Sequence, residues 1–501
     1  MGQMRFVAAR QEAIPPDAVE RAYLAGMEGI PWRSRNWWTD VDEESGPGEF
    51  ILQRDASDSG NLYIPWCVEG FHELVLSTGS LMERDRPYRL PLELARGTVN
   101  RIRNQVAEWQ CMGLQLSAEL SAELQLLADT FAEAATAPLG SDAEHEGSEK
   151  AIQLAVAVMD SLMRTYVDQA IAGRRMQSPT LPTFFACRVG SRPVADPEVP
   201  GFVAALNAAM VAFQWREIEP VHGRFQWDAY DRQIQWCRDQ GLRIIGGPLL
   251  QLDRHQIPDG LYVWEGDFDQ ILANVQHYVR AVVERYRGKV HVWNCAARMN
   301  LECAVRLSEE ERLRLVVGVI DEVQRLDART PYIISFDQPW AEYLASADSD
   351  FSPLHFADSL VRAELGLAGI ALEMNLGYWP HGTPLRDWFE ISRQLDRWNF
   401  LGLPLLVIAS SPSGISADEK SLVPASTSSC PGSTPSLESQ QRMIDGLASL
   451  ALAKSFVHGF IWNDLTDAGS HEFAHGGLFD AHGRPKPSLQ RLATLRKQFL
   501  S

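Results

Sequence analysis

From about residue 181 onward, short apolar segments alternate with amphipathic segments of helical length. Eight segments read as strands: 183–188, 207–213, 242–250, 289–296, 331–336, 368–375, 403–409 and 457–463. Helices are expected between them, including 228–240, 267–286, 308–325, 383–399 and 436–454. Strands that alternate with helices form a parallel sheet. Eight such units in roughly 320 residues predict a (β/α)8, or TIM, barrel, in which functional side chains follow the carboxyl ends of the strands.

Two further regions are expected before the barrel, which is taken as 181–501. Residues 1–90 are predicted to form a small β-sandwich-like domain, with strands at 4–9, 49–54, 62–68 and 72–78. Residues 91–180 are predicted to form a helical bracket, with apolar residues at helical spacing in 90–109, 119–135 and 151–167. The acidic stretch 140–149 is expected to be a solvated loop. The fold class is therefore α/β, a TIM barrel preceded by a small β-rich domain and a helical segment.

The charge balance restricts the partners. A net charge of −19 and a pI near 5.1 disfavour nucleic acid and anionic membranes, because an acidic surface repels phosphate. Neutral ligands such as sugars remain open. The oligomeric state does not follow from the sequence.

The cysteines and the N-terminal residues bear on the compartment. The seven cysteines are scattered and none forms a CxxC pair, so neither a disulfide framework nor a zinc knuckle is expected. The first residues lack an apolar run of signal-peptide length, and no stretch approaches 18 apolar residues. The expectation is a cytoplasmic, reduced protein without a membrane span.

Three blocks of the barrel, 213–225 (FQWREIEPVHGRF), 285–294 (RYRGKVHVWN) and 459–487 (with GFIWND, GLFD and PKP), together resemble glycoside hydrolase family 10, the xylanase family. Residues 213–225 (FQWREIEPVHGRF) resemble the family's MKWxxxEPxxGxFxF, and 285–294 (RYRGKVHVWN) resemble the approach to its fourth strand. Residues 459–487 contain GFIWND, GLFD and PKP, which resemble the last strand and the ending that follows it. The three blocks come in the family's order, and the resemblance implies its TIM barrel and glycoside hydrolysis.

The positions that the resemblance assigns to catalysis have changed. Arg298 stands where the family has its acid/base Glu, and Ala409 stands where it has the nucleophile. Val211 replaces a sugar-binding Asn, and 246–252 (GGPLLQL) lacks the His and Trp of the third strand. No carboxylate occurs between residues 401 and 417, so a shift of register cannot restore the nucleophile.

Retaining hydrolysis needs two carboxyl groups about 5–5.5 Å apart. An Arg cannot donate its proton at a useful pH, and an Ala side chain carries no group that could act as the nucleophile. Glu373 and Asp337, near the ends of the sixth and fifth strands, are the candidates for a relocated catalytic pair. Asp253 and Glu302 also lie after strands. The alternative is that Arg298 and Glu373 form an ion pair that replaces the catalytic machinery.

Aromatic and polar side chains near the predicted mouth allow sugar binding. Pyranose rings stack their CH faces on aromatic planes while their hydroxyls hydrogen-bond to polar neighbours. The candidate ligands of an oligo- or polysaccharide are Trp215, Gln251, Asn294, Arg298, Asn375, Tyr378, Trp462 and Asp464. Trp340 and Trp379 belong to the same aromatic group, and Trp215 and Trp462 could equally fill the top of the barrel.

Residues 471–475 (HEFAH) match HExxH, a zinc signature that requires a helix to turn both His to one side. Glycines at 469 and 476–477 interrupt a helix on both flanks, so neither a metal nor another cofactor is expected.

Three hypotheses follow. The first is a carbohydrate-binding barrel without the standard catalytic pair. The second is an active glycoside hydrolase with relocated carboxylates that include Glu373. The third is a structural or interaction scaffold. The Ser-, Pro- and Gly-rich stretch 410–436 is predicted to be a flexible lid or a disordered insertion at the functional face.

Overall fold

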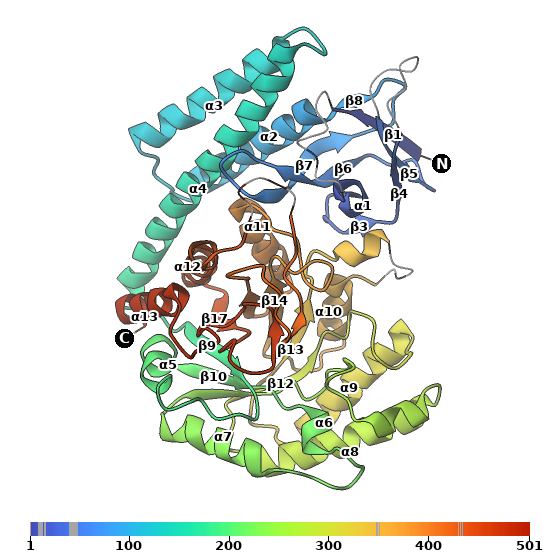
Figure 1. Cartoon of the computed structure of the whole chain (residues 1–501), viewed down its shortest axis with the longest axis vertical. Helices are drawn as coiled ribbons and strands as arrows, with labels where there is room; N and C mark the ends of the chain where they lie inside the picture. Colours follow the sequence, from blue (N-terminus) through green and yellow to red (C-terminus); the bar gives the residue numbers. More distant parts are fainter. Residues whose placement is uncertain are drawn as a thin grey trace.

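The C-terminal part of the chain forms a closed barrel of parallel strands (Figure 1). The computed structural model describes residues 2–8, 14, 17–39, 49–346, 349, 351–428, 430, 432 and 434–500. The barrel strands are β9 (Phe184–Val189), β10 (Ala208–Val211), β11 (Arg243–Gly246), β12 (Val292–Ala297), β13 (Tyr332–Asp337), β14 (Gly369–Asn375), β15 (Leu405–Ser410) and β17 (Val457–Trp462). Each strand pairs in parallel with the next, and β17 closes the ring onto β9. The predicted TIM barrel is confirmed, and every predicted strand overlaps an observed one.

Helices surround the barrel. They are α5 (Val199–Ala205), α7 (Asp228–Asp239), α8 (Phe268–Tyr286), α9 (Glu309–Leu326), α10 (Pro353–Arg362), α11 (Trp388–Asn399), α12 (Leu437–Ala453) and α13 (Pro487–Phe499). Several begin at a polar N-cap. Ser308 opens α9 with a capping box, because its hydroxyl accepts from the Glu311 N–H and the Glu311 carboxylate accepts from the Ser308 N–H.

The interior of the barrel is filled by small and branched apolar side chains. Alternate strand residues point inward, and they form a separate cluster of Ala186, Ala208, Met210, Ile245, Ile333, Ala371, Leu406, Ile408 and Ile461. The other strand residues pack outward against the helices, in the main core. The alternation fixes which residues point into the mouth at the carboxyl ends of the strands.

Residues before the helices form two four-stranded sheets. One has the order β4-β5-β1-β8 and contains β1 (Gly2–Val7), β4 (Arg35–Trp38), β5 (Glu49–Arg54) and β8 (Tyr88–Arg89). The other has the order β3-β2-β6-β7 and contains β2 (Tyr23–Ala25), β3 (Pro31–Trp32), β6 (Gly60–Cys67) and β7 (Glu73–Leu81). All four predicted strands overlap observed ones. Ala9, the last residue of the first predicted strand, lies outside the described residues.

Three helices follow the sheets: α2 (Leu90–Cys111), α3 (Ala118–Thr136) and α4 (Asp142–Gln177). In Figure 1, α4 runs from the N-terminal sheets down the side of the barrel, where it contacts α11 and α12. The prediction of a loop over 140–149 is wrong, because α4 already begins at Asp142. Ser141 caps that helix, and the acidic residues of its first turn interact favourably with the positive end of the helix dipole.

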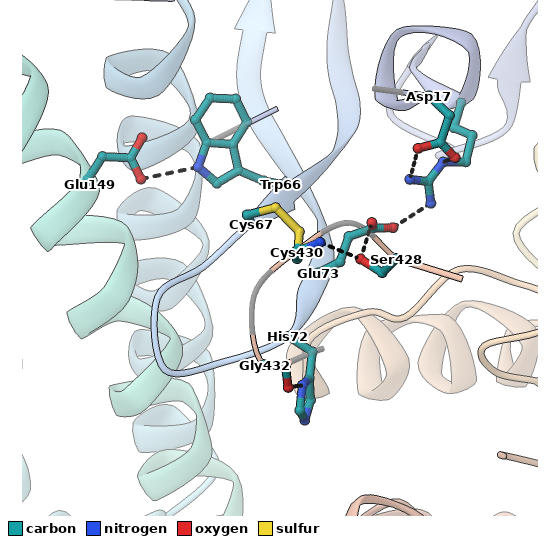
Figure 2. Close-up of a disulfide and its surroundings, with 10 residues drawn as sticks. Asp17, Trp66, Cys67, His72, Glu73, Glu149, Ser428, Cys430 and Gly432 are labelled. Atoms are coloured by element: carbon teal, nitrogen blue, oxygen red, sulfur yellow. Dashed lines mark hydrogen bonds and ion pairs between the residues drawn. A yellow bond between two sulfur atoms is a disulfide. The ribbon is translucent and has the colours of Figure 1, made fainter. Parts of the chain in front are cut away.

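A disulfide joins Cys67 at the end of β6 to Cys430, 363 residues further on (Figure 2). The expectation that no disulfide would form is therefore wrong. Two cysteines so far apart in the sequence give no recognisable spacing, and only the packing of the N-terminal sheets against the barrel brings them together.

The described part of the 410–436 stretch is held in place, so it is not a disordered insertion. It contains β16 (Ser421–Val423), which pairs in parallel with β18 (His471–Phe473). Near the disulfide, Ser428 donates to Glu73 at 2.9 Å, and the ring of His72 lies 3.0 Å from the Gly432 carbonyl (Figure 2). Residues 429, 431 and 433 lie outside the described part.

No helix within the described part of the chain combines the length and apolar character that a membrane span requires.

Candidate functional site

Arg298 lies directly after β12, at the mouth of the barrel. Its backbone has a φ of 60°, in the left-handed region that residues other than glycine rarely adopt. The Arg298 N–H donates to the Ser335 carbonyl of β13 at 3.2 Å. Its side chain is only 9% exposed. A buried guanidinium in an unfavourable backbone conformation must be stabilised by its contacts, which therefore define the site.

Strand alternation brings carboxylates to this guanidinium. Ala371 points into the barrel, so Glu373, two residues further along β14, points the same way. Ile333 likewise places Asp337 of β13 on the inner side. Both carboxylates lie at the carboxyl ends of their strands, where the sequence predicted candidate catalytic groups.

Four carboxylates surround Arg298. Glu373 Oε2 accepts from Arg298 Nε at 2.9 Å and from Nη2 at 2.7 Å. Asp337 Oδ2 lies 3.3 Å from Arg298 Nε, and Asp253 Oδ2 lies 3.4 Å from Nη1. Glu472 accepts from Arg298 Nη1 and, at 2.7 Å, from Arg188 Nη1. The predicted ion pair between Arg298 and Glu373 is thus one part of a larger cluster, which we call the Arg298 cluster (Arg188, Asp253, Arg298, Asp337, Glu373 and Glu472).

Carboxylates outnumber cations in the Arg298 cluster, and the pKa values reflect this. Burial alone would lower the pKa of Arg298, but the carboxylates, with Glu373 first, raise it well above its ordinary value. Burial raises the pKa of Asp337 well above its ordinary value against the opposing effect of Arg298. Burial would also raise the pKa of Glu472, but Arg298 and Arg188 lower it instead. Burial thus shifts the pKa of Asp337 upward, whereas the two guanidinium groups shift the pKa of Glu472 downward.

An amide and hydroxyl network supports the cluster from the strand ends. Asn375 donates to Asp337 Oδ1 at 3.2 Å and accepts from Ser410 Oγ at 3.2 Å and from Asn463 Nδ2 at 2.9 Å. Asn294 donates to Ser335 Oγ at 2.7 Å. Asn294 and Asn375 are both predicted sugar ligands, but here they form hydrogen bonds with other residues at the ends of the strands.

The segment after β17 closes the mouth. Asp464 accepts from the N–H groups of Glu472 and Phe473 at 3.1 and 2.9 Å, which directs Glu472 toward Arg298. Tyr378 donates to the Ala474 carbonyl at 3.0 Å, and Trp462 Nε1 donates to the Gly476 carbonyl at 2.7 Å. Burial and the Glu472 carboxylate raise the pKa of Asp464 to about 6.

The HExxH segment is β18 and the turn after it, not a helix. His471 Nε2 lies 3.0 Å from Asp418 Oδ2, whereas His475 Nε2 lies 2.8 Å from the Ser416 carbonyl. Glu472 points away from both, into the Arg298 cluster. His471, Glu472 and His475 therefore contact three different partners and do not face one common point, as the ligands of a metal ion would.

The predicted sugar ligands are buried. Trp215, Gln251, Asn294, Asn375, Tyr378, Trp462 and Asp464 each have 7% exposure or less. Trp215 stacks on Tyr278 with ring centroids 4.9 Å apart, and Trp340 donates its ring N–H to Glu390. Trp215 and Trp340 thus pack against residues of α8 and α11 and are nearly fully buried, so the role of the predicted ligands in sugar binding stays a prediction.

The register of β15 refines the comparison of catalytic positions. Ile408 points into the barrel and Ala409 outward into the main core, so Ser410 is the residue that points into the mouth. Ser410 accordingly bonds to Asn375. The residue that points into the mouth nearest to the expected nucleophile is thus Ser410 instead of Ala409. Its hydroxyl is no substitute for the missing carboxylate.

An open pocket lies beside the mouth, between the barrel and the N-terminal sheets. Its cavity volume is about 110 Å³, and its lining includes Gly377 after β14 and Ser411 after β15. The half-buried rings of Trp379 and Trp388 line it, and Arg21 and Glu73 come from the N-terminal region. We call it the interdomain pocket. Of the predicted aromatic group, only Trp379 lies in it.

No pattern in the sequence placed Arg188 or Glu472 at the site. Arg188 points inward because Ala186 does, which requires knowing the phase of β9. Glu472 lies in β18, after the last barrel strand, and the resemblance of its segment to a zinc motif suggested a different role.

Comparison with known proteins agrees with the barrel. Residues 206–299 match the model of glycosyl hydrolase family 10, a range that begins just before β10 and ends one residue past Arg298. The chain thus contains a barrel that is similar, over this range, to glycosyl hydrolase family 10.

Among individual proteins, the endo-1,4-beta-xylanase C of Paenibacillus barcinonensis is 25% identical over 83 residues. These are 15% of this chain and 8% of that xylanase, so the match spans less than a tenth of the relative. Native xylanase 10B from Thermotoga maritima aligns with 65% of this chain and 98% of its own, at 15% identity and a TM-score of 0.49. Xylanase 10B from Thermotoga petrophila RKU-1, in complex with xylobiose, aligns with 63% and 94%, at 15% identity and a TM-score of 0.48.

Proposed function

We propose that this protein is a carbohydrate-binding barrel that has lost retaining glycoside hydrolysis. The Arg298 cluster is the observation that carries the proposal. A guanidinium stands where the family resemblance assigns the general acid, and it forms ion pairs with the carboxylates around it. Since retaining hydrolysis needs one free carboxylate and one carboxylic acid at an accessible bond, a buried ion cluster does not meet the requirement.

The interdomain pocket supports the binding half of the proposal. It lies between the barrel and the N-terminal sheets, and boundaries of this kind are places where small-ligand sites occur. Trp379 and Trp388 supply planar apolar faces, and Ser411, Ser426 and Arg442 supply hydrogen-bonding groups beside them. This combination suits an oligosaccharide, and the pocket lies at the barrel face where the strands end.

The test is xylooligosaccharide binding measured by isothermal titration calorimetry, together with a hydrolysis assay on xylan. We expect binding without turnover, and an affinity at least tenfold weaker in Trp379→Ala. Phe400→Ala, which removes an exposed aromatic ring outside the pocket, is the control and should bind as the parent does. Xylan turnover by the parent protein would refute the loss of hydrolysis. If Trp379→Ala binds as tightly as the parent, the interdomain pocket is not the binding site.

A second candidate function is hydrolysis by a relocated pair, Glu373 and Asp337. The observation in its favour is that both carboxylates contact the Arg298 Nε atom, while burial raises the pKa of Asp337. Two neighbouring carboxyl groups whose surroundings differ are the arrangement that acid–base catalysis uses. Their exposure of 3% and 1% opposes this function, because no substrate reaches them unless the β18 segment moves.

This second candidate predicts measurable glycosidase activity that falls by several orders of magnitude in both Glu373→Gln and Asp337→Asn. Activity that is absent, or that survives both substitutions, would eliminate it.

The compartment is a separate question. Disulfides persist in oxidising compartments, whereas the sequence expectation was cytoplasmic. Alkylation of protein taken directly from its cells decides between them: a protected Cys67–Cys430 pair would support an oxidising compartment, and free thiols would support the cytoplasm.

A further inference from the structure

Glu219, His222 and His277 form a cluster on the outer rim of the barrel, separate from the Arg298 cluster. Glu219 and His222 follow the short helix α6 (Trp215–Ile218), and His277 lies in the middle of α8. One carboxylate oxygen and one nitrogen of each imidazole all lie within 4.8 Å of one another. Three groups of metal-ligand chemistry thus converge from two elements of the fold.

Glu219 is a buried carboxylate that faces histidines. The side chain is only 2% exposed, and its Oε2 accepts from the Trp215 ring N–H at 2.9 Å. Its Oε1 accepts from the Gly223 N–H at 2.7 Å and lies 3.6 Å from His222 Nδ1 and 3.5 Å from His277 Nε2. Among the described residues, no Lys or Arg forms an ion pair with it at 4.0 Å or less. A buried carboxylate requires a compensating positive charge, and the histidines are the groups that lie in place to supply or hold one.

The Nε2 atom of His277 faces the Glu219 carboxylate. Its Nε2 is buried and has no hydrogen-bond partner within the described structure. The rings of His222 and His277 lie with their centroids 4.8 Å apart, so both present their edges to the same small volume. An unsatisfied buried nitrogen of this kind needs a ligand or a proton.

The spacing of the donors suits a small divalent ion. Zinc binds imidazole nitrogen and carboxylate oxygen at about 2.0–2.2 Å in tetrahedral geometry, which puts neighbouring ligand atoms about 3.3–3.6 Å apart. Both separations from Glu219 Oε1, 3.5 and 3.6 Å, agree with this. His222, whose side chain is 68% exposed, is free of the core and can adjust the third edge.

We propose that Glu219, His222 and His277 bind a divalent transition metal ion of the zinc type with three protein ligands and one open position. The three residues line a groove together with Trp264 and Val221, which are 39% and 56% exposed. A fourth ligand, water or a small molecule bearing an N or O donor, therefore reaches the ion from solvent. Two His, one Glu and an open position are the arrangement of a zinc site that binds or activates its fourth ligand.

The test uses the full chain with Cys111→Ser, which removes an exposed thiol that would bind metal on its own. After chelation and dialysis, titration with Zn²⁺ is expected to give one equivalent bound in the parent and at least a hundredfold weaker binding in His222→Ala. His277→Gln should show the same loss. His482→Ala, which removes an exposed histidine elsewhere, is the matched control and should keep full binding.

A spectroscopic readout separates a built site from surface binding. Co²⁺ in place of Zn²⁺ should give the intense visible absorption of tetrahedral coordination in the parent and in His482→Ala, but not in His222→Ala. Trp215→Phe removes the hydrogen bond that orients Glu219 and is expected to weaken binding about 10–100-fold without changing the stoichiometry. If the parent binds no more Zn²⁺ than the double variant that carries both His222→Ala and His277→Gln, Glu219 is paired with a protonated histidine and the proposal is wrong.

Discussion

Arg298 illustrates how one buried charge organises a site. Its guanidinium contacts carboxylates from β13, from β14, from β18 and from the loop that carries Asp253. Removal of one partner from a buried ion cluster leaves uncompensated charge, which costs far more than the intact cluster contributes. The cluster is therefore a feature on which the barrel mouth depends, whatever the mouth binds.

Arg298→Met keeps the length of the side chain and removes its charge. We expect the free energy of unfolding at pH 7 to fall by about 3–5 kcal/mol, because four carboxylates are left together in a buried site. The loss should be smaller near pH 4, where those carboxyls can take up protons. Urea denaturation at both pH values measures it. Arg362→Met, which removes an exposed pair with Asp358, should change stability by less than about 1 kcal/mol. Equal effects of the two substitutions would contradict the account.

Glu149 gives a pH dependence with a defined sign. Burial raises its pKa to about 7, against the hydrogen bond from the Trp66 ring N–H at 3.3 Å (Figure 2). Since the folded state favours the protonated carboxyl, its stabilising contribution is complete below the ordinary pKa of 4.5 and is lost as the pH rises to about 7. The loss is on the order of 3 kcal/mol.

Glu149→Gln is neutral at every pH, so its melting temperature should exceed that of the parent at pH 8 and match it near pH 4.5. Thermal unfolding followed by circular dichroism from pH 4.5 to pH 8 measures this difference in melting temperature. The exposed Glu133→Gln should show no difference from the parent that grows with pH. A parallel pH profile for Glu149→Gln and the parent would show that Glu149 is ionised throughout.

At the residue level the sequence predicted part of the site. Arg298 was found through the family resemblance, and Glu373 and Asp337 were found because each lies near the end of an apolar run expected to be a strand. Glu472 and Arg188 were not found, because a side chain in a short strand outside the barrel, or at an unknown phase of a strand, has no pattern that fixes its direction. Ala409 shows the same limit: the strand was predicted, but its phase places Ser410 at the mouth instead.

At the level of elements, the segment that covers the mouth depends on long-range links. β16 and β18 pair only across the top of the barrel, and the disulfide ties the same segment to β6. The strands and helices of the barrel were predictable because period-2 and period-3.6 patterns are local. The disulfide and β16–β18 were not, because their partners meet only after the chain has folded.

Cys430→Ser should lower the free energy of unfolding by about 2–4 kcal/mol, the range for loss of a native disulfide. Thermal unfolding with and without dithiothreitol measures the effect, and the reductant should destabilise the parent but not the variant. Cys111→Ser, at an exposed free thiol, should leave both curves unchanged. If dithiothreitol lowers the melting temperature of Cys430→Ser as much as that of the parent, another bond is being reduced.

For the whole molecule, one apolar core runs from the N-terminal sheets through the helices into the barrel. Trp109 of α2 stacks on Tyr166 of α4 at 4.4 Å and meets Phe389 of the barrel helix α11 at 5.2 Å. Charged contacts reinforce this boundary, since Arg386 bonds to Tyr23 at 2.9 Å and to Glu342 at 2.8 Å. The regions that the sequence predicted as three separate domains share this core, and whether they unfold separately stays to be measured.

Trp109→Ala should destabilise the whole chain by about 3–5 kcal/mol, because it empties a large volume where three helices meet. We expect a single unfolding transition that tryptophan fluorescence and circular dichroism report identically in parent and variant. Phe400→Ala, at a ring that is 90% exposed, is the control and should be nearly neutral. Two separated transitions in the parent would show that the N-terminal region and the barrel are independent units.

The bond between Cys67 and Cys430 makes most of the barrel part of a covalent ring. A protease that cuts the backbone once at any point between these residues opens the ring but separates nothing. The nicked protein should therefore migrate as one intact band on a denaturing gel without thiol and as two fragments once thiol is added. A cut outside the ring, before Cys67 or after Cys430, releases its fragment under either condition.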